Sequence, residues 1–263
     1  YMATGAVGAT IRLIPNKIMP LAALGLPTIV GNLAHKKSGI IFITGCTGSG
    51  KSTTMASMLE WVNQTGHPGK VITIEDPIET VFKPSRSIFV QREVGLDTPS
   101  FDIGTLDAMR QDPDILCIGE MRDAPSIRAA LMAAETGHLV LTTLHTRDAS
   151  KTAQRILTSV PSSDQESLRE QLSMTLEAVI SQELLPRADG KGLVLACEIL
   201  IVTPAVRQLI RENKLEAIND AIQSGGDVGM ISKDLFIRNL FKTHAITKDV
   251  ALEYMRNPDM LSR

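Results

Sequence analysis

The sequence has few aromatic residues, few cysteines and no long apolar run. Aromatic side chains make up 3% of its 263 residues, so aliphatic residues and methionine must fill the core. Cys46, Cys117 and Cys197 form no C-x-x-C pair, which argues against a disulfide framework or a cysteine zinc site and fits a reducing cytoplasm. No apolar run approaches the roughly 20 residues that a membrane-spanning helix needs. We expect a cytoplasmic protein.

An excess of basic residues is also missing. The formal net charge is −2 and the pI is about 6.3. A local basic stripe could survive this averaging, but the balance argues against nucleic acid as the main partner. We therefore expect protein partners and no nucleic acid.

The first part of the chain reads as the end of a domain followed by a linker. Residues 10–14 alternate in polarity like a half-buried strand, and residues 15–31 are punctuated by proline and glycine around a short helix. The chain opens without a signal-peptide pattern. We expect residues 1–31 to be the remnant of an N-terminal domain whose upstream part is missing.

Residues 32–202 are predicted to form an α/β core. Four short β-branched runs, at residues 40–43, 71–74, 115–118 and 139–141, alternate with helical patterns. The helical patterns place apolar residues at i, i+3, i+4 and i+7, beginning at Met55, Ile127 and Ala153. This alternation predicts a doubly wound sheet.

Residues 203–263 are predicted to be a helical C-terminal region. Thr203-Pro204 is typical of an N-cap followed by proline at the first helical position. Ser224-Gly225-Gly226 is the best candidate for a flexible joint within this region.

A P-loop follows the first predicted core strand. Its residues are Gly45, Cys46, Thr47, Gly48, Ser49, Gly50, Lys51, Ser52 and Thr53. The glycines let backbone N–H groups point into a nest for phosphates, and the following helix adds positive potential at its N-terminus. Lys51 would reach the β- and γ-phosphate oxygens, and Ser52 could ligate Mg²⁺. The expected ligands are ATP and Mg²⁺.

Acidic residues follow two further strands. Glu75, Asp76 and Glu79 come just after the run at 71–74, and Glu120 follows the run at 115–118. Ligands bind at the carboxyl ends of parallel strands. A hydrophobic run followed by an acid is the arrangement that holds Mg²⁺ in P-loop enzymes, so Glu120 would complement Ser52.

Two histidines bracket the run at 139–141. A neutral imidazole at a strand end could sense the γ-phosphate or hydrogen-bond an acid. His145 follows the strand and is the better functional candidate, while His138 precedes it and could serve packing alone.

These elements together resemble the secretion-superfamily ATPases, whose signatures are a Walker A loop, an Asp box, a Walker B element and a His box. The matching segments are 45–53, 74–79, 112–123 and 134–139. The resemblance covers nearly the whole chain and is greatest to the PilT group of pilus retraction motors. It implies a RecA-like core.

The resemblance also implies roles. Glu79 would be the catalytic glutamate that orients or deprotonates water, Glu120 the acid at Mg²⁺, and His138 with His145 the His-box pair. The family forms homohexamers, binds ATP between two lobes, and takes arginines from a neighbouring lobe or subunit. The candidates for that arginine are Arg12, Arg92, Arg110 and Arg122, and the sequence does not choose between them.

Residues 205–212 look like the AIRNLIRE helix of the retraction motors, differing at Val206 and Gln208. We therefore expect a cytoplasmic motor that docks on an inner-membrane platform protein. Thr146-Arg147-Asp148 and Cys117 depart from the pilus motors and leave type IVB secretion or conjugation open. The alternatives are a RecA-like nucleic-acid motor and a structural subunit that binds nucleotide but hydrolyses little.

Overall fold

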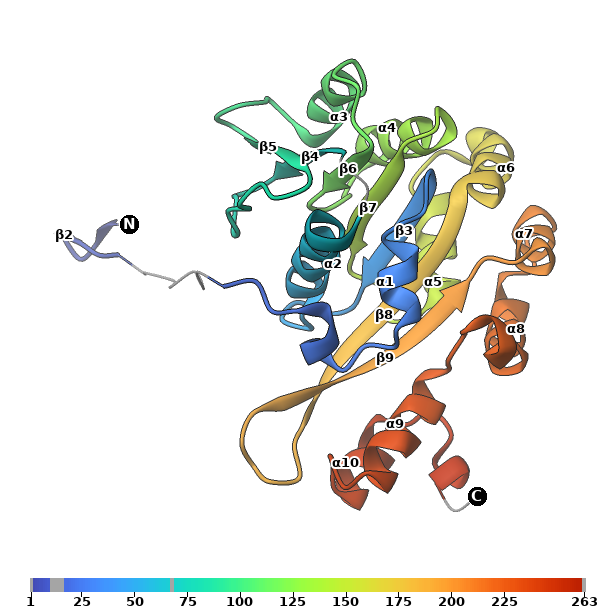
Figure 1. The fold of residues 1–263 in the computed structure, drawn as a ribbon. Helices are drawn as coiled ribbons and strands as arrows, with labels where there is room; N and C mark the ends of the chain where they lie inside the picture. Colours follow the sequence, from blue (N-terminus) through green and yellow to red (C-terminus); the bar gives the residue numbers. More distant parts are fainter. Residues whose placement is uncertain (1, 10–16, 67–68, 262–263) are drawn as a thin grey trace.

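The computed structural model describes residues 2–9, 17–66 and 69–261 (Figure 1). A central sheet has the strand order β5-β4-β6-β7-β3-β8-β9, and the last two strands form an antiparallel hairpin. All its other neighbouring strands are parallel. The strands are β3 (Gly39–Thr44), β4 (Lys70–Glu75), β5 (Ile88–Glu93), β6 (Ile115–Ile118), β7 (Leu139–Leu144), β8 (Leu176–Pro186) and β9 (Leu193–Ile201). A separate two-stranded sheet joins β1 (Met2–Ala3) to β2 (Ala6–Val7).

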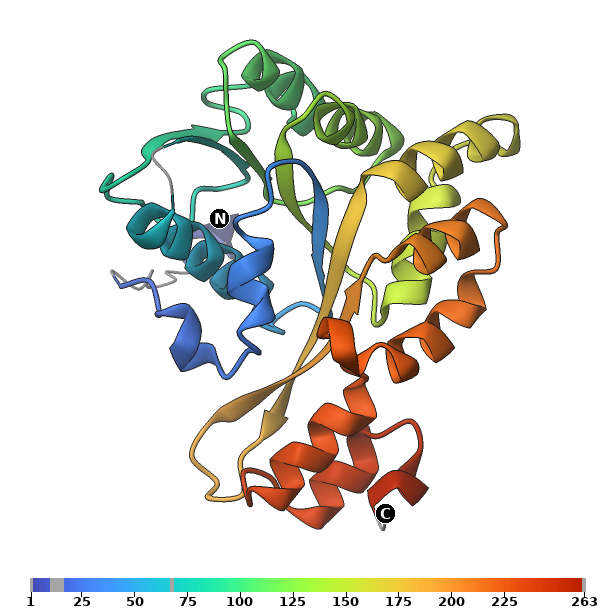
Figure 2. The same ribbon diagram turned by 45° about the vertical axis from the view of Figure 1, so that its right-hand side comes forward.

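Helices cover both faces of the central sheet (Figures 1 and 2). The helices are α1 (Ile29–Leu33), α2 (Lys51–Thr65), α3 (Phe101–Met109), α4 (Ala124–Glu135), α5 (Ala149–Leu157), α6 (Gln165–Thr175), α7 (Pro204–Arg211), α8 (Ile218–Ser224), α9 (Lys233–Lys242) and α10 (Lys248–Tyr254). Short 3₁₀ turns are η1 (Leu21–Leu24), η2 (Ser162–Asp164), η3 (Leu215–Ala217), η4 (Gly226–Val228) and η5 (Pro258–Leu261).

The core divides into two apolar clusters, one on each face of the sheet. Phe42, Ile72 and their alternate neighbours pack against α3 to α8. Ile41, Ile43 and residues of the opposite parity pack against η1, α1, α2, α9 and α10. Because side chains alternate across a strand, each parallel strand supplies both clusters, which explains its continuous apolar run.

The α/β fold with a RecA-like core is confirmed, and the four predicted strands are β3, β4, β6 and β7. Two of the predicted helical patterns lie in α2 and α4, and the third begins in α5 but extends past its end at Leu157 to Val160. Residues 204–261 are helical except for the connecting segments and one bridge at Ile231. Sequence analysis missed β5, β8 and β9. The predicted strand at residues 10–14 lies outside the described residues, and the division at residues 31 and 202 stays a prediction.

Helix starts follow the capping residues in the sequence. The Thr203 hydroxyl accepts a hydrogen bond from the backbone N–H of Val206 at 3.3 Å, with Pro204 at the first position of α7. At Ser224-Gly225-Gly226, α8 ends and η4 begins. Among the described residues, no helix has both the length and the apolar character to cross a bilayer.

Candidate functional site

The P-loop joins the carboxyl end of β3 to the first turn of α2. Gly48 and Gly50 have φ angles of 80° and 87°, a left-handed conformation that glycine adopts without strain. Gly50 is the N-cap of α2, and no side chain caps this helix. The first N–H groups of α2 therefore have no side-chain acceptor, which suits them to bind an anion.

Gly45 is required because β8 lies directly against it. A Cβ atom at this position would lie 2.3 Å from the backbone oxygen of Gln182 and 2.4 Å from the Ser49 hydroxyl oxygen. Its φ angle of 145° adds to the constraint. The start of the P-loop is thus fixed by contact with the neighbouring strand.

Lys51 is buried at the start of α2. Its ammonium group donates to the backbone oxygens of Gly45 at 2.9 Å and Cys46 at 3.0 Å. Burial lowers the pKa of Lys51, while Cys46 and the Glu120 carboxylate act in the opposite direction. The Lys51 side chain therefore lies over its own loop, where it could help to bind a phosphate.

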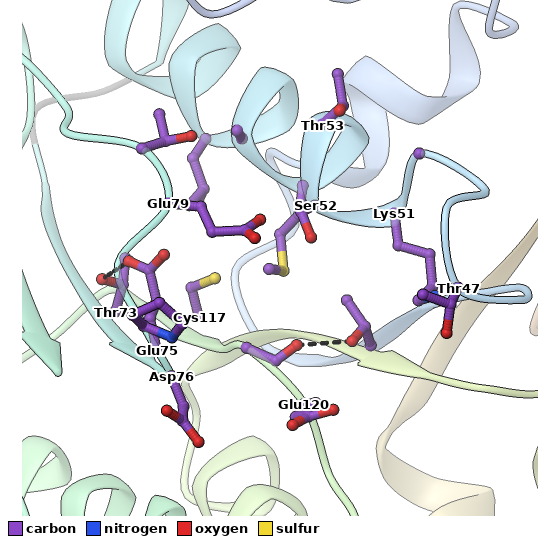
Figure 3. A pocket seen from close by; sticks show the side chains of 18 of the residues that line it. Thr47, Lys51, Ser52, Thr53, Thr73, Glu75, Asp76, Glu79, Cys117 and Glu120 are labelled. Atoms are coloured by element: carbon purple, nitrogen blue, oxygen red, sulfur yellow. Dashed lines mark hydrogen bonds between the residues drawn. The ribbon is translucent and has the colours of Figure 1, made fainter. Parts of the chain in front are cut away.

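A cavity of about 550 Å³ opens beside the P-loop (Figure 3). This volume is within the usual range for small-molecule sites. Six P-loop residues line it: Thr47, Gly48, Gly50, Lys51, Ser52 and Thr53. Gly45, Cys46 and Ser49 do not; Gly45 and Cys46 line a separate, smaller cavity, and Ser49 is buried.

The Asp-box acids line the same cavity from the segment after β4. In Figure 3 the Glu79 carboxylate points into the cavity, and Ser52 points into it from the start of α2. Glu75 is held by Thr73 Oγ1 at 2.6 Å and Gln91 Nε2 at 3.1 Å. Burial raises the pKa of Glu75 despite these hydrogen bonds. The peptide bond between Asp76 and Pro77 is cis.

Glu120 lies across the cavity, just after β6. One carboxylate oxygen lies 2.6 Å from Arg122 Nη2, and the other lies 3.7 Å from Nε2 of His145. His145 directly follows β7, so two neighbouring parallel strands bring these residues to the same edge. The three predicted catalytic residues, Glu79, Glu120 and His145, all line the cavity.

His138 lies elsewhere. It precedes β7, at the end of the strands opposite the cavity. There its Nδ1 is 3.0 Å from the backbone oxygen of Ala133 and 3.2 Å from Thr136 Oγ1. These contacts connect the end of α4 to β7. Its position fits a packing role and does not bring it to the cavity.

Of the four arginine candidates, Arg122 alone lines the cavity in the described part of the chain. Arg92 donates to the backbone oxygen of Asp97 at 2.9 Å. Arg110 is an exposed residue at the end of α3, and Arg12 lies outside the described residues. Arg122 itself is largely exposed and paired with Glu120.

The residues present fit a nucleotide with a divalent cation. Ser52 and Glu120 supply hard oxygen ligands on one cavity, as Mg²⁺ prefers. Within residues 2–9, 17–66 and 69–261, no three His, Cys, Asp or Glu side chains form a complete metal cluster. Mg²⁺ bound here would therefore need phosphate oxygens and waters as further ligands, as at other nucleotide sites.

Several lining residues were not predicted. Thr143, on β7, donates to the backbone oxygen of Gly119 at 2.6 Å and so positions the residue before Glu120. An apolar wall is formed by Met55, Ala56, Leu59, Phe82, Phe101 and Leu184. Phe82 stacks on Phe89 with ring centroids 4.6 Å apart. No motif flags these positions, because only the folded chain brings them together.

The fold and this site define a P-loop ATPase with a RecA-like core. Residues 9–225 match the family described as Type II/IV secretion system protein. The chain therefore belongs to this family, and it is a PilT-like secretion ATPase.

Individual relatives agree with this assignment. A Neisseria gonorrhoeae twitching motility protein is 44% identical over 97% of this chain and 68% of its own length. The type IV pilus retraction ATPase PilT of Pseudomonas aeruginosa is 43% identical over 96% of this chain and 73% of its own length. The crystal structure of the pilus retraction motor PilT with bound ADP matches with a TM-score of 0.88 at 47% identity, covering 96% of this chain and 71% of that one.

Proposed function

We propose that this chain is the ATPase part of a homohexameric motor that powers type IV pilus retraction or a related secretion or conjugation apparatus. The observation that carries the proposal is a single cavity. It brings together an uncapped P-loop helix, Glu79 and Glu120. The similarity to retraction ATPases over almost the whole chain supports the biological setting.

The residues around the cavity suggest a division of labour. Lys51 and the backbone N–H groups of the P-loop hold the phosphates, and Glu79 orients the attacking water. His145, whose Nε2 lies 3.7 Å from Glu120 Oε2, would sense the γ-phosphate by a hydrogen bond formed when nucleotide binds. Mg²⁺, held by Ser52 and Glu120, would neutralise charge on the β- and γ-phosphate oxygens. Catalysis then consists mainly of positioning and electrostatic stabilisation.

In a homohexamer, a neighbouring subunit could add a cationic side chain to the cavity. Among the described lining residues, the cationic side chains are Lys51, Arg122 and the titratable His145. Arg122 is already paired with Glu120. Charge that develops on the transferred phosphoryl group needs a further cation, and an arginine from a neighbouring subunit would couple hydrolysis to subunit movement.

The partner and location follow from the same proposal. A retraction motor acts from the cytoplasm, so we place this protein at the inner membrane, docked peripherally on a platform protein of the pilus or secretion system. The exposed residues of α7 are one candidate contact: Gln208, Arg211 and Glu212 hydrogen-bond to one another at its surface. We propose no nucleic-acid partner.

The test compares wild type with Glu79→Gln in the full-length protein. We expect Mg²⁺-dependent ATP turnover by a hexamer, and a fall in turnover of about 100-fold or more in Glu79→Gln with nucleotide binding retained. Glu253→Gln, on the exposed side of α10, is the matched control and should turn over like wild type. Oligomer mass is recorded in the same samples.

The alternatives give different results. A wild-type ring that binds ATP but barely hydrolyses it would mean a structural subunit. Turnover stimulated by DNA, with affinity that falls steeply as salt rises, would mean a nucleic-acid motor. Either result would reject the proposal.

A further inference from the structure

Two buried carboxylates lie close together outside the nucleotide cavity. Asp148 and Glu198 are 6% and 3% exposed. Asp148 is the N-cap of α5, where it accepts from the backbone N–H of Lys151 at 2.8 Å. Glu198, on β9, accepts from the first N–H of the same helix, that of Ala149, at 3.1 Å. Both acids therefore hold the start of α5.

Arg256 joins these two acids. Its Nη2 lies 3.4 Å from Asp148 Oδ2, and its Nη1 lies 3.2 Å from Glu198 Oε2. A guanidinium can use two nitrogens at once in this way, whereas an ammonium group acts as a point charge. Lys151, the other cation on Asp148, lies at 3.6 Å and is largely exposed.

Arg256 is itself fixed by the C-terminal helices. Its backbone N–H donates to Asp234 Oδ1 at 2.8 Å, and the N–H of Asn257 donates to Asp234 Oδ2 at 2.9 Å. Asp234 is buried in the first turn of α9. Arg256 thus joins three elements: its backbone bonds to the start of α9, and its guanidinium contacts the start of α5 and β9.

Asp148 lies three residues further along the chain than His145, a residue of the nucleotide cavity. His145, which lines the cavity beside Glu120, is joined to Asp148 by Thr146 and Arg147 alone. Thr146 Oγ1 lies 2.6 Å from Thr152 Oγ1, which bonds to the backbone oxygen of Asp148 at 2.7 Å. The loop from His145 to Asp148 therefore has its geometry set by the start of α5.

Removal of the guanidinium would disturb this arrangement electrostatically. Burial raises the pKa of Glu198, and the neighbouring Asp148 raises it too, whereas Arg256, the Ala149 N–H and Lys233 lower it. Without Arg256, two buried acids of like charge would face each other with reduced compensation. The start of α5 would then have to shift, or one of the two acids would have to take up a proton.

We propose that Arg256 is a positioning residue for ATP hydrolysis: by bridging Asp148 and Glu198, it ties the α9–α10 helices to the loop that presents His145. This inference rests on the proposed role of the cavity in ATP hydrolysis. Arg256, in the segment after α10, would then affect hydrolysis at the nucleotide cavity without lining it.

The experiment measures Arg256→Gln and Arg256→Lys in the full-length protein. The matched control is Arg187→Gln, because Arg187 is 42% exposed against 43% for Arg256 and is also paired with a carboxylate, Asp189, but lies in the turn between β8 and β9. We record kcat, KM, nucleotide affinity by a fluorescent ATP analogue, melting temperature and oligomer mass for each.

We expect kcat of Arg256→Gln to fall by about 10-fold to 100-fold, with nucleotide affinity within about twofold of wild type, because the geometry and not the phosphate contacts is lost. Arg256→Lys should recover part of kcat, and Arg187→Gln should match wild type. If the glutamine variant does not fold, the lysine variant carries the test, with a lowered kcat at wild-type affinity.

Other outcomes would overturn the proposal. Equal kcat for wild type and both Arg256 variants would remove any positioning role. A parallel fall in kcat, affinity and melting temperature, without recovery by lysine, would assign Arg256 to packing alone. If the wild-type protein itself does not hydrolyse ATP, the proposed function fails first, which distinguishes that failure from the failure of this inference.

Discussion

The start of α2 differs from the starts of five other helices in the molecule. At α4, α5, α7, α9 and α10, an Asp, Ser or Thr side chain accepts a hydrogen bond from the third backbone N–H. At α2 the capping position is Gly50, with no side-chain acceptor. Each uncapped N–H group needs another partner. The starts of α1, α3, α6 and α8 also have no side-chain cap, but α2 begins within the P-loop, where its N–H groups can bind a ligand.

Two regions of the molecule, the nucleotide cavity and the surroundings of Arg256, also differ in how their charged side chains are paired. Around Arg256, both carboxylate oxygens of Asp234 accept backbone N–H groups, and Glu198 on β9 has a partner for each oxygen. At the cavity, Lys51 bonds only to carbonyls of its own loop. The charges around Arg256 are thus paired between different elements, whereas Lys51 is bound by carbonyls of its own loop, which a phosphate could replace.

The largest effect is expected for Lys51→Ala. If the donors at α2 serve a ligand, loss of the ammonium should lower ATP turnover by about 10³-fold or more and weaken nucleotide binding, since it removes the main cation at the phosphates. Turnover and analogue binding are measured together. Lys214→Ala, a surface lysine paired with Glu212, should leave both values unchanged. Retained binding in Lys51→Ala would place the nucleotide elsewhere.

Ile180→Ala tests whether the two regions share one folding unit. Ile180 is fully buried on β8, between the P-loop strand and the hairpin partner β9. Its truncation should lower the free energy of unfolding by about 2–5 kcal/mol, through lost burial and a cavity. Urea denaturation measures this value, and Leu193→Ala, which is 56% exposed, is the control. Two separate transitions would show that the regions unfold independently.

Thr203→Ala examines a helix end that serves the fold. Loss of the hydroxyl that caps α7 should cost about 1 kcal/mol of unfolding free energy without changing turnover. Thr243→Ala is the control, because its hydroxyl bonds only to carbonyls of its own helix end, and it should cost less than half as much. A change in turnover for Thr203→Ala would extend the nucleotide site to α7.

The smallest expected effect is the pH dependence of stability from Glu75. Its pKa is raised above the ordinary value of 4.5, mainly by burial. The folded protein then holds this proton more tightly than the unfolded chain does. The contribution of Glu75 to stability is present below pH 4.5 and is lost as the pH rises through the folded pKa.

Glu75→Gln should remove this loss. The stability of the variant relative to wild type should therefore increase as the pH is raised from about 4.5 through the folded pKa, measured by urea denaturation at a series of pH values. Glu166→Gln, an exposed residue of α6, should keep the wild-type slope. A constant difference between Glu75→Gln and wild type would contradict the raised pKa.

The fold could be predicted from the sequence for four of the strands that are buried on both faces, although β9, which is also buried on both faces, was missed. β3, β4, β6 and β7 are short continuous apolar runs, which the sequence displays directly. β5 was missed because it is a half-exposed edge strand. β8 was missed because it follows α6 without an intervening turn and carries Ser181, Gln182 and Glu183 within the strand. Pairing with β3 and β9, and not local preference, makes it extended.

The cavity could be predicted only in its motif residues. Lys51, Glu79, Glu120 and His145 follow strands whose ends share one edge of a parallel sheet, so their proximity follows from the alternation of strands and helices. Arg256 could not be placed in this way, because its partner Asp148 is more than 100 residues earlier in the chain. Spacing along a sequence carries no information about such a contact.

The contact between Gly45 and β8 limits how this protein can change over evolution. At the other end of β3, a Cβ atom on Gly39 would lie 2.4 Å from a side-chain carbon of Glu177 and 2.8 Å from the Thr175 oxygen. The P-loop strand is thus held against the same neighbour at both ends. A sequence change that moved β8 would move the phosphate site with it, so the two strands must vary together or remain as they are.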